Sequence, residues 1–336
     1  MRFSFRSFRF NIKTMKAIQV SQPGGPEALN LVELPIPEPK PNEAVVANKA
    51  VGVNFIDVYF REGRYLAALP FTVGQEAAGV INAIGSDVTS LKVGDRVAYT
   101  GVLGAYAESA AVPAERLVKI PANLDFQQAA AAMLQGMTAH YLSHATYPIK
   151  RGDNVLIHAA AGGVGLLLVQ MAKRLGARVI GTAGSPAKAQ LAKEAGADEL
   201  IIYTTQDFEI ETMRLTGGKG VDVVYDGVGK TTFEKDLKVL RPRGYLVAYG
   251  GSSGAIPPFD LMTLNKHGSL FVTRPSLHHY IHSREELEER SNEVLGMVAR
   301  GELKLRIHKN YPLAEAEMAH RDLEGRKTTG KLLLIP

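Results

Sequence analysis

Apolar and polar positions alternate in a regular rhythm from residue 153 onward. Short apolar runs there alternate with segments in which apolar residues recur at helical spacing. We predict strands at 153–159, Arg178–Thr182, Glu199–Tyr203, Val221–Tyr225 and Tyr245–Tyr249, and helices at 164–175, Pro186–Ala195, Phe208–Leu215 and Thr231–Leu240. This alternation is typical of parallel βαβ units in a doubly wound α/β sheet, which a further strand at Leu270–Thr273 would extend.

The segment before this region has a different, β-rich and irregular pattern. Glycine and proline separate short predicted strands at Lys16–Val20, Ala44–Val53, Ala78–Ile84, Arg96–Tyr99 and Leu117–Ile120. Residues 125–144 are rich in helix formers and almost uncharged at their centre, which predicts a buried linking helix. After a charged amphipathic helix at 284–300 the pattern becomes β-like again and ends in Lys331–Ile335. We therefore expect the C-terminus to return and complete the first domain.

Composition limits the classes of function. The 336 residues suffice for two domains, and no apolar run approaches the length of a membrane span. The chain has no cysteine, which excludes disulfides, thiol nucleophiles and thiolate metal sites. Of the net charge of +5, residues 1–14 contribute +4, so the rest is nearly neutral and gives little reason to expect nucleic-acid binding. We expect this basic leader to lie outside the fold, as a transit peptide, a start assigned too early or an added extension.

A glycine-rich turn follows the strand at 154–157. It reads His158-Ala-Ala-Ala-Gly-Gly-Val-Gly165 and leads into the helix at 164–175. Gly162 would let the backbone approach a pyrophosphate, Gly165 would let the helix pack on the strand, and the helix N-terminus would offer free N–H groups. Ala160 replaces the usual first glycine. We predict that a dinucleotide contacts Ala161, Gly162, Gly163, Val164 and Gly165.

The second predicted strand of this sheet indicates which dinucleotide is bound. Such folds usually place an acid about 20 residues after the glycine turn, where it holds a ribose 2′-hydroxyl. Ser185 stands there instead, followed by Lys188, and neither would repel a 2′-phosphate. NADPH is therefore favoured over NADH, although Lys188 could also be an ordinary solvated helix lysine.

Three other groups of residues suggest chemistry, and each has a simpler explanation. Gly229-Lys230-Thr231 resembles the end of a P-loop, but Val224 occupies the place of its first glycine, so ATP is rejected. His278, His279 and His282 have no thiolate or suitably spaced carboxylate to complete a metal site. Asp57 and Glu76 form a possible acid–base pair, with structural roles at least as plausible.

Six motifs together resemble the quinone oxidoreductase (zeta-crystallin-like) branch of the medium-chain dehydrogenase/reductase superfamily. They are GVNFIDVYFREGRY at 52–65, VGQEAAGVI at 73–81, GDRVAY at 94–99, HAAAGGVG at 158–165, VDVVYDGVG at 221–229 and GSLFVTRPSL at 268–277. The resemblance implies a GroES-like β-rich catalytic domain, residues 15–138 and 277–336, around a Rossmann NADPH-binding domain, residues 139–276. It places cofactor and substrate between the two.

The resemblance also indicates that the chain uses no metal. Zinc-dependent alcohol dehydrogenases of the superfamily have Cys where this chain has Asn54 and His where it has Gln75, and their third ligand is also Cys. Without imidazole and thiolate ligands we expect no catalytic zinc, and therefore no alcohol oxidation, which needs a Lewis acid.

By resemblance, specific residues line the cleft. The expected catalytic residues are Asn54, Asp57, Tyr59 and Tyr65, although the two tyrosines could equally be packing residues. Thr138 is expected beside the cofactor, Lys188, Tyr203 and Arg326 around the 2′-phosphate, and Gly250, Ser253, Phe271 and Thr273 on segments bordering the nicotinamide.

These observations predict a cytoplasmic, homodimeric, zinc-independent NADPH-dependent quinone oxidoreductase. A quinone is already an electrophile, so orientation next to the cofactor could supply most of the catalysis. A 2-alkenal or enone reductase is the enzymatic alternative. A non-enzymatic role, in RNA binding or as a crystallin, is the alternative from another class.

Overall fold

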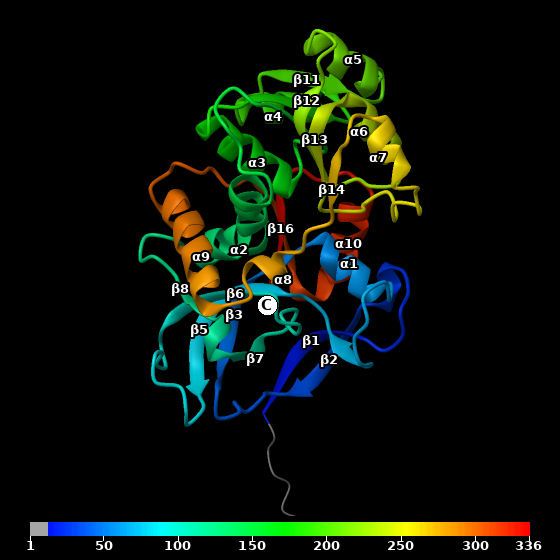
Figure 1. Cartoon of the computed structure of the whole chain (residues 1–336). Coiled ribbons are helices and arrows are strands. Elements are labelled where there is room, and N and C mark those ends of the chain that lie inside the picture. Colours follow the sequence, from blue (N-terminus) through cyan, green and yellow to red (C-terminus); the bar gives the residue numbers. More distant parts are fainter. Residues whose placement is uncertain (1–12) are drawn as a thin grey trace, which may run out of the picture.

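The alternating half of the chain forms one six-stranded parallel sheet (Figure 1). Its order is β11-β10-β9-β12-β13-β14, made of Asn154–Ile157 (β9), Arg178–Ala183 (β10), Glu199–Ile202 (β11), Val221–Asp226 (β12), Leu240–Ala248 (β13) and Phe271–Thr273 (β14). The predicted doubly wound sheet is confirmed, including the extension by β14. The strand order reverses between β9 and β12, so the carboxyl end of β9 is the switch point at which such sheets bind ligands.

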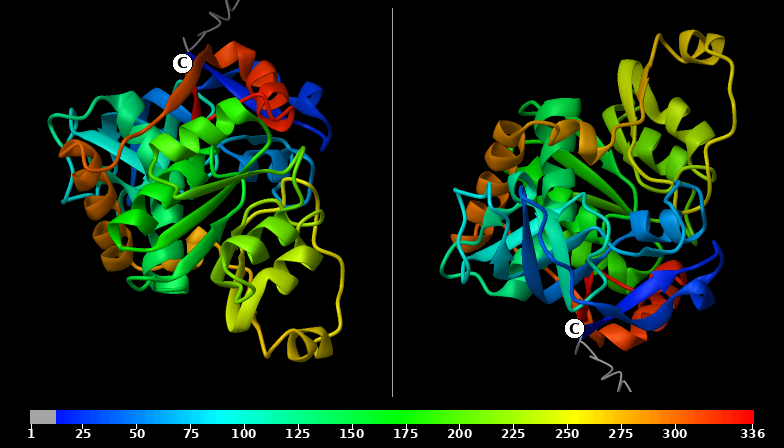
Figure 2. Two further views of the ribbon diagram at one scale, coloured as in Figure 1. Left: turned by 90° about the horizontal axis from the view of Figure 1, so that it is seen from above. Right: turned by 90° about the horizontal axis from the view of Figure 1, so that it is seen from below.

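Helices connect these strands in the expected sequence. They are α3 (Gly163–Arg174), α4 (Pro186–Glu194), α5 (Phe208–Leu215) and α6 (Phe233–Val239), each within two residues of its predicted bounds. The connection from β13 to β14 contains the short α7 (Met262–Lys266). Figure 2 shows that this connection reaches away from the rest of the sheet.

The first and last parts of the chain build a second, mixed sheet. Its order is β15-β16-β3-β5-β6-β8, with β7 also paired to β3. The strands are Glu43–Val53 (β3), Glu76–Ile84 (β5), Arg96–Thr100 (β6), Ser109–Pro113 (β7), Val118–Lys119 (β8), Ile307–Pro312 (β15) and Lys331–Ile335 (β16). The predicted return of the C-terminus is confirmed, because β16 pairs antiparallel with β3. Three further strands, Thr14–Val20 (β1), Asn30–Pro35 (β2) and Phe71–Thr72 (β4), form a small separate sheet.

A buried helix joins the two sheets. α2 (Phe126–Tyr141) begins at Asp125, whose carboxylate accepts the Gln128 N–H at 2.7 Å. One hydrophobic cluster runs from Ala50 and Ala78 of the mixed sheet through Met137 to Val155 of the parallel sheet. Because this core is continuous, the predicted domain boundary at residues 138 and 139 stays a prediction.

Four more α-helices lie in the described part of the chain, residues 13–336. They are α1 (Phe55–Arg61), α8 (Leu277–Tyr280), α9 (Arg284–Ala299) and α10 (Ala316–Glu324). No helix within these residues is long and apolar enough to cross a bilayer. The predicted leader, residues 1–14, falls outside the description except for its last two residues, the second of which begins β1.

Candidate active site

The glycine turn has the backbone geometry that a diphosphate needs. Gly162 is the N-cap of α3 and has no side chain to cover the first N–H groups of this 12-residue helix. A Cβ on Gly165 would lie 2.3 Å from the Ala159 carbonyl oxygen, so only glycine lets α3 pack this closely. The turn is held from outside by the Gly330 N–H, which donates to the Ala161 carbonyl at 3.2 Å. These free donors at a helix N-terminus fit the diphosphate of a dinucleotide.

The structure brings the four predicted 2′-phosphate residues together around the start of α4. Ser185 is the N-cap of α4, and its hydroxyl oxygen accepts the Lys188 N–H at 3.3 Å. The Lys188 ammonium donates to the Arg326 carbonyl at 2.6 Å, although these residues are 138 positions apart. Tyr203 packs its phenol over Gly184, since a Cβ there would lie 2.6 Å from the phenol oxygen.

This set of donors has the charge that a phosphate requires. It comprises a lysine, an arginine and two hydroxyls. Partial burial and the Arg326 charge lower the pKa of Lys188, which shows that the two cations act on each other. An additional dianion would relieve their repulsion, so the site fits a 2′-phosphate better than a 2′-hydroxyl.

The residues predicted near the nicotinamide are dispersed. Ser253 joins two loops, because its hydroxyl donates to the Val228 carbonyl at 2.8 Å and accepts the Thr231 N–H at 3.1 Å. Gly250 is the second residue after β13, at the carboxyl edge of the sheet, and Thr273 ends β14 at the same edge.

Phe271 and Thr138 are less easily linked to this edge. Phe271 pairs with Tyr245, three residues before the end of β13, and therefore lies about 10 Å below the carboxyl edge. Its ring stacks on the Tyr245 ring at 4.5 Å and is half exposed. Thr138 is buried in α2, 7% exposed. For both residues the cofactor contact stays a prediction.

Asn54 belongs to a buried polar cluster between the mixed sheet and α2. Its side-chain amide donates to Glu76 Oε2 at 2.8 Å, and its carbonyl oxygen accepts from the Lys331 ammonium at 2.7 Å. Lys331 also forms an ion pair with Glu76, and both residues are at most 2% exposed. Gln135 of α2 donates to the same Asn54 oxygen at 3.3 Å.

This cluster does not fit a zinc ion. The positions of two zinc ligands are occupied by the amides of Asn54 and Gln75, which are poor ligands for this metal. The Asn54 oxygen and the Glu76 carboxylate already accept from the Lys331 ammonium. A cationic side chain thus provides the positive charge at this site, and no reaction step is assigned to zinc.

The position of Asp57 differs from the prediction. Its side chain has no exposed surface, so it does not line the cleft. Oδ2 accepts the Asn54 N–H at 2.8 Å and the Tyr106 hydroxyl at 3.0 Å, while Oδ1 has no partner. Burial raises the pKa of this carboxyl to about 7. Because Asp57 lies in the first turn of α1, these contacts hold the start of that helix rather than a substrate.

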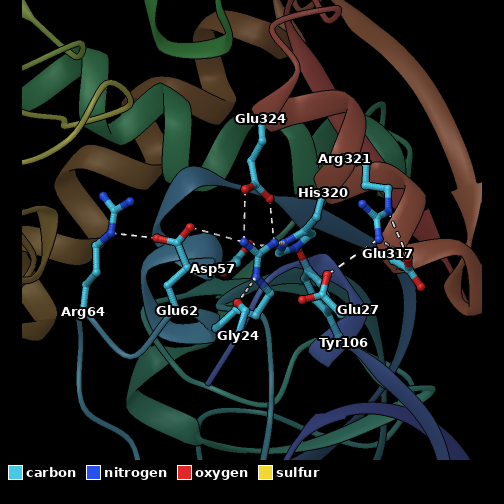
Figure 3. Close-up of polar contacts among 11 residues, drawn as sticks. Gly24, Glu27, Asp57, Glu62, Arg64, Tyr106, Glu317, His320, Arg321 and Glu324 are labelled. Atoms are coloured by element: carbon cyan, nitrogen blue, oxygen red, sulfur yellow. Dashed lines mark hydrogen bonds and ion pairs between the residues drawn. The ribbon is translucent and has the colours of Figure 1, made fainter. Parts of the chain in front are cut away.

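Asp57 ends a directional chain of hydrogen bonds (Figure 3). The buried Arg61 guanidinium lies 3.0 Å from His320 Nδ1, and a guanidinium only donates, so the His320 proton is on Nε2. That N–H then donates to the Tyr106 oxygen at 3.0 Å, and Tyr106 donates to Asp57. Burial and the Arg61 charge lower the pKa of His320 to about 3, which keeps the ring neutral. Sequence reasoning missed this network because its members come from distant segments.

Tyr59 of α1 contacts the loop that follows β13 of the parallel sheet. Its hydroxyl accepts the Gly251 N–H at 3.1 Å, and its ring meets the Tyr65 ring edge-on at 5.7 Å between centroids. Burial raises the pKa of Tyr59, so the phenol is protonated at neutral pH. Beside it is a cavity of about 180 Å³ lined by Phe55, Val58, Tyr59, Glu62, Arg64, Gly251, Ser252 and Glu324. Of these, the sequence had indicated only Tyr59, and its catalytic role, like that of Tyr65, stays a prediction.

One histidine cluster is found in the described residues, at a place the sequence had not indicated. His140, His144 and Glu293 bring their ligand atoms within 4.8 Å of one another, whereas His278, His279 and His282 form no such group. Arg290 donates to His140 Nδ1 at 3.3 Å, which leaves the proton on Nε2, 2.8 Å from the Glu293 carboxylate. Both ring nitrogens of His140 therefore have hydrogen-bond partners, and His140 links α2 to α9.

Comparison with known proteins agrees with this arrangement. Residues 40–122 match the alcohol dehydrogenase GroES-like domain, and residues 163–289 match the family described as zinc-binding dehydrogenase. The chain is 48% identical over 323 residues to quinone oxidoreductase 1 of Escherichia coli, covering 95% of this chain and 99% of that protein. It is 44% identical to a 2-haloacrylate reductase of a Burkholderia species, covering 95% and 98%. The crystal structure of an E. coli quinone oxidoreductase complexed with NADPH superposes with a TM-score of 0.94 at 47% identity, covering 96% and 100%.

Proposed function

The chain belongs to the quinone oxidoreductase branch of the medium-chain dehydrogenase/reductase superfamily, and from this premise we propose that it reduces quinones with NADPH and without zinc. It is an oxidoreductase, and NADPH is its cofactor. The observation that supports a metal-free reaction is the Lys331 ammonium bound to Asn54 and Glu76. A reaction at this site therefore needs a substrate that is electrophilic without a Lewis acid, as a quinone is.

The chain's own residues bind and orient the reactants. The glycine turn at 162–165 would hold the diphosphate, and Ser185, Lys188, Tyr203 and Arg326 the 2′-phosphate. The protonated Tyr59 hydroxyl can donate a hydrogen bond to a substrate oxygen, because its contact with the Gly251 N–H uses only its acceptor side. Bound NADPH supplies a hydride, two electrons with one hydrogen nucleus, which together with one proton from solvent converts a quinone to its hydroquinone.

Reduction of an activated carbon–carbon double bond is the second candidate. The 44% identical relative is a 2-haloacrylate reductase, and a 2-alkenal or enone is likewise electrophilic without a metal. This reaction would add hydride to the β-carbon and a proton to the α-carbon. It therefore needs a proton donor near carbon as well as the orientation that suffices for a quinone.

Parallel steady-state assays separate these functions. We expect NADPH oxidation with 1,4-benzoquinone or 1,2-naphthoquinone that is unchanged by EDTA, and a lower kcat/KM with a 2-alkenal. Turnover confined to simple alcohols, or activity that requires added zinc, would refute the proposal. A higher kcat/KM with the 2-alkenal would favour the second candidate.

The proposed assembly and location are a homodimer in the cytoplasm. β14 is an edge strand whose Phe271 is half exposed, and Leu261 and Met262 are exposed in the preceding segment. A second copy of the chain would cover these residues. Sedimentation equilibrium with Phe271→Glu, and cell fractionation, test the two statements. Salt-sensitive RNA binding in a filter assay, combined with no reductase activity, would instead support the non-enzymatic alternative.

A further inference from the structure

Two features of the cavity beside Tyr59 and of its surroundings indicate the kind of substrate that the cavity accepts. We propose that the cavity beside Tyr59 selects uncharged quinones with an apolar substituent, and that the substituent lies on an apolar lip formed by Tyr65, Leu66 and Leu69. This inference rests on the proposed function and specifies its substrate class. It predicts that the enzyme discriminates against the carboxylate type of substrate that the 2-haloacrylate reductase is named for.

The first feature is the mutual neutralisation of the charges that line the cavity. Glu324 receives two hydrogen bonds from the buried Arg61, at 2.6 and 3.1 Å (Figure 3). Arg64 pairs with Glu62 at 2.7 Å, and its guanidinium also lies over the Tyr59 ring, 5.2 Å from the centroid. Each carboxylate at the cavity thus has an arginine partner. No charge among the eight lining residues is free to pay for desolvation of an ionic substrate.

A further cation near Tyr59 does not change this balance. The Arg274 charge acts on the Tyr59 hydroxyl, but its guanidinium donates to the Ala248 carbonyl at 2.9 Å. Arg274 is not among the residues that line the cavity. Within the cavity a substrate carboxylate would therefore meet only the Arg64 cation, whose charge the Glu62 carboxylate already balances.

The second feature is an exposed apolar surface next to the cavity-lining Tyr59. Tyr59 contacts Tyr65, which meets the Phe60 ring edge-on at 5.5 Å, and Phe60 contacts Phe71 at 6.4 Å. The start of the lip is fixed to α1, because the N–H groups of Arg64 and Tyr65 both donate to the Tyr59 carbonyl. These ring contacts therefore hold Tyr65, the first residue of the lip, beside the cavity-lining Tyr59.

The lip exposes more apolar surface than a structural role requires. Leu66 is 93% exposed, and Leu69 and Tyr65 are 47% and 41% exposed. This surface begins at Tyr65, whose ring contacts the cavity-lining Tyr59, so a substituent that leaves the cavity on the Tyr65 side would lie on it. Covering these side chains with an alkyl chain removes apolar area from water on both partners.

The first experiment measures how kcat/KM depends on substituent length. The probes are 1,4-benzoquinones with n-alkyl substituents from ethyl to hexyl, assayed with the full chain and NADPH. We expect kcat/KM to rise about twofold per methylene, half the free energy of complete burial because the lip covers one side of the chain. Leu66→Ser and Leu69→Ser should reduce this slope, whereas Leu31→Ser, an equally simple change of an exposed leucine on β2, should not.

The second experiment tests the neutralised charges. The probes are an alkyl-substituted and a carboxyalkyl-substituted benzoquinone of equal length. The unmodified protein should prefer the alkyl compound, and Glu62→Gln should raise kcat/KM for the carboxylate by roughly threefold by releasing Arg64. Glu317→Gln, which removes the partner of Arg321 in a similar 2.7 Å pair, is the matched control and should have no effect.

Different results would refute different statements. Turnover of quinones with no dependence on substituent length in the unmodified protein would refute the apolar lip. A preference of the unmodified protein for the carboxylate would refute the neutral cavity. No turnover of any quinone would instead contradict the proposed function itself.

Discussion

Replacing Lys188 by alanine tests how the chain recognises its cofactor. The Lys188 ammonium donates to the Arg326 carbonyl at 2.6 Å, and the Lys188 backbone N–H donates to the Ser185 hydroxyl at the start of α4. The substitution removes one cation from the proposed 2′-phosphate site. It also removes the bond that positions Arg326, which has a left-handed backbone conformation, φ 54°.

The expected loss follows from the exposure and chemistry of this contact. A charge-assisted hydrogen bond contributes about 1.5–3 kcal/mol. Lys188 is only partly buried, so solvent screening limits the loss to the lower end, roughly tenfold in the Kd of NADPH. NADH lacks the 2′-phosphate, and its Kd should change by less than about twofold.

Fluorescence titration of both cofactors measures this difference. Lys193→Ala is the matched control, because Lys193 is on the same helix but donates to the Asp198 carbonyl at 2.8 Å. Ser185→Asp is the converse change. Aspartate is also a good N-cap, so α4 should stay intact while the added charge repels the phosphate. Equal losses of NADH and NADPH affinity in Lys188→Ala would show that the lysine is structural and refute the phosphate site.

Three further predictions concern the buried groups. Lys331→Met should lower the free energy of unfolding by about 3–5 kcal/mol in urea titrations by leaving Glu76 buried without its cation, and adding Glu76→Gln should restore part of the loss. The pKa of Asp57 is about 7 in the folded state, above its ordinary value of 3.8, so the folded state binds more protons at this group between pH 4 and 7. Its contribution to stability therefore falls as pH rises. Urea titrations should therefore show Asp57→Asn gaining on the unmodified protein from pH 4 to 7, and a constant difference would contradict the assignment. Tyr59→Phe should lower kcat/KM for quinones by roughly threefold to tenfold through loss of one neutral hydrogen bond, and a loss above 100-fold would make Tyr59 a proton donor instead.

Much of the nucleotide-binding half was predictable because its signals are local. Each βα unit has its apolar period, its turn and its helix start within about 20 residues, and backbone geometry follows from these. The glycine turn and the absence of an acid at Ser185 could therefore be read directly, and the structure places Ser185 as the N-cap of α4. The return of the C-terminus was also predictable, from the β-like pattern of Lys331–Ile335.

The polar site of the mixed sheet was not predictable in this way. A seven-residue helix, α1, has too little length to show a helical period, so the contacts of Asp57 were hidden. Arg61 and His320 are 259 positions apart, and Lys331 and Glu76 are 255 apart. Nothing in the neighbourhood of either member indicates the other.

The sequence by itself determined which segments become strands and helices, where a dinucleotide can approach the backbone, and that no cysteine can ligate a metal. Only the tertiary structure decided which charges meet. The periodicity of apolar residues indicates that one face of a helix or strand is buried, but not which element covers it. A buried polar group is satisfied by whichever hydrogen-bonding partner the chain topology places beside it. Here β16 places Lys331 against Asn54, and α10 places His320 and Glu324 against Arg61. Asp57, the expected catalytic carboxylate, is instead a buried support of α1, bound by the nearby Asn54 N–H and by the Tyr106 hydroxyl from a distant segment.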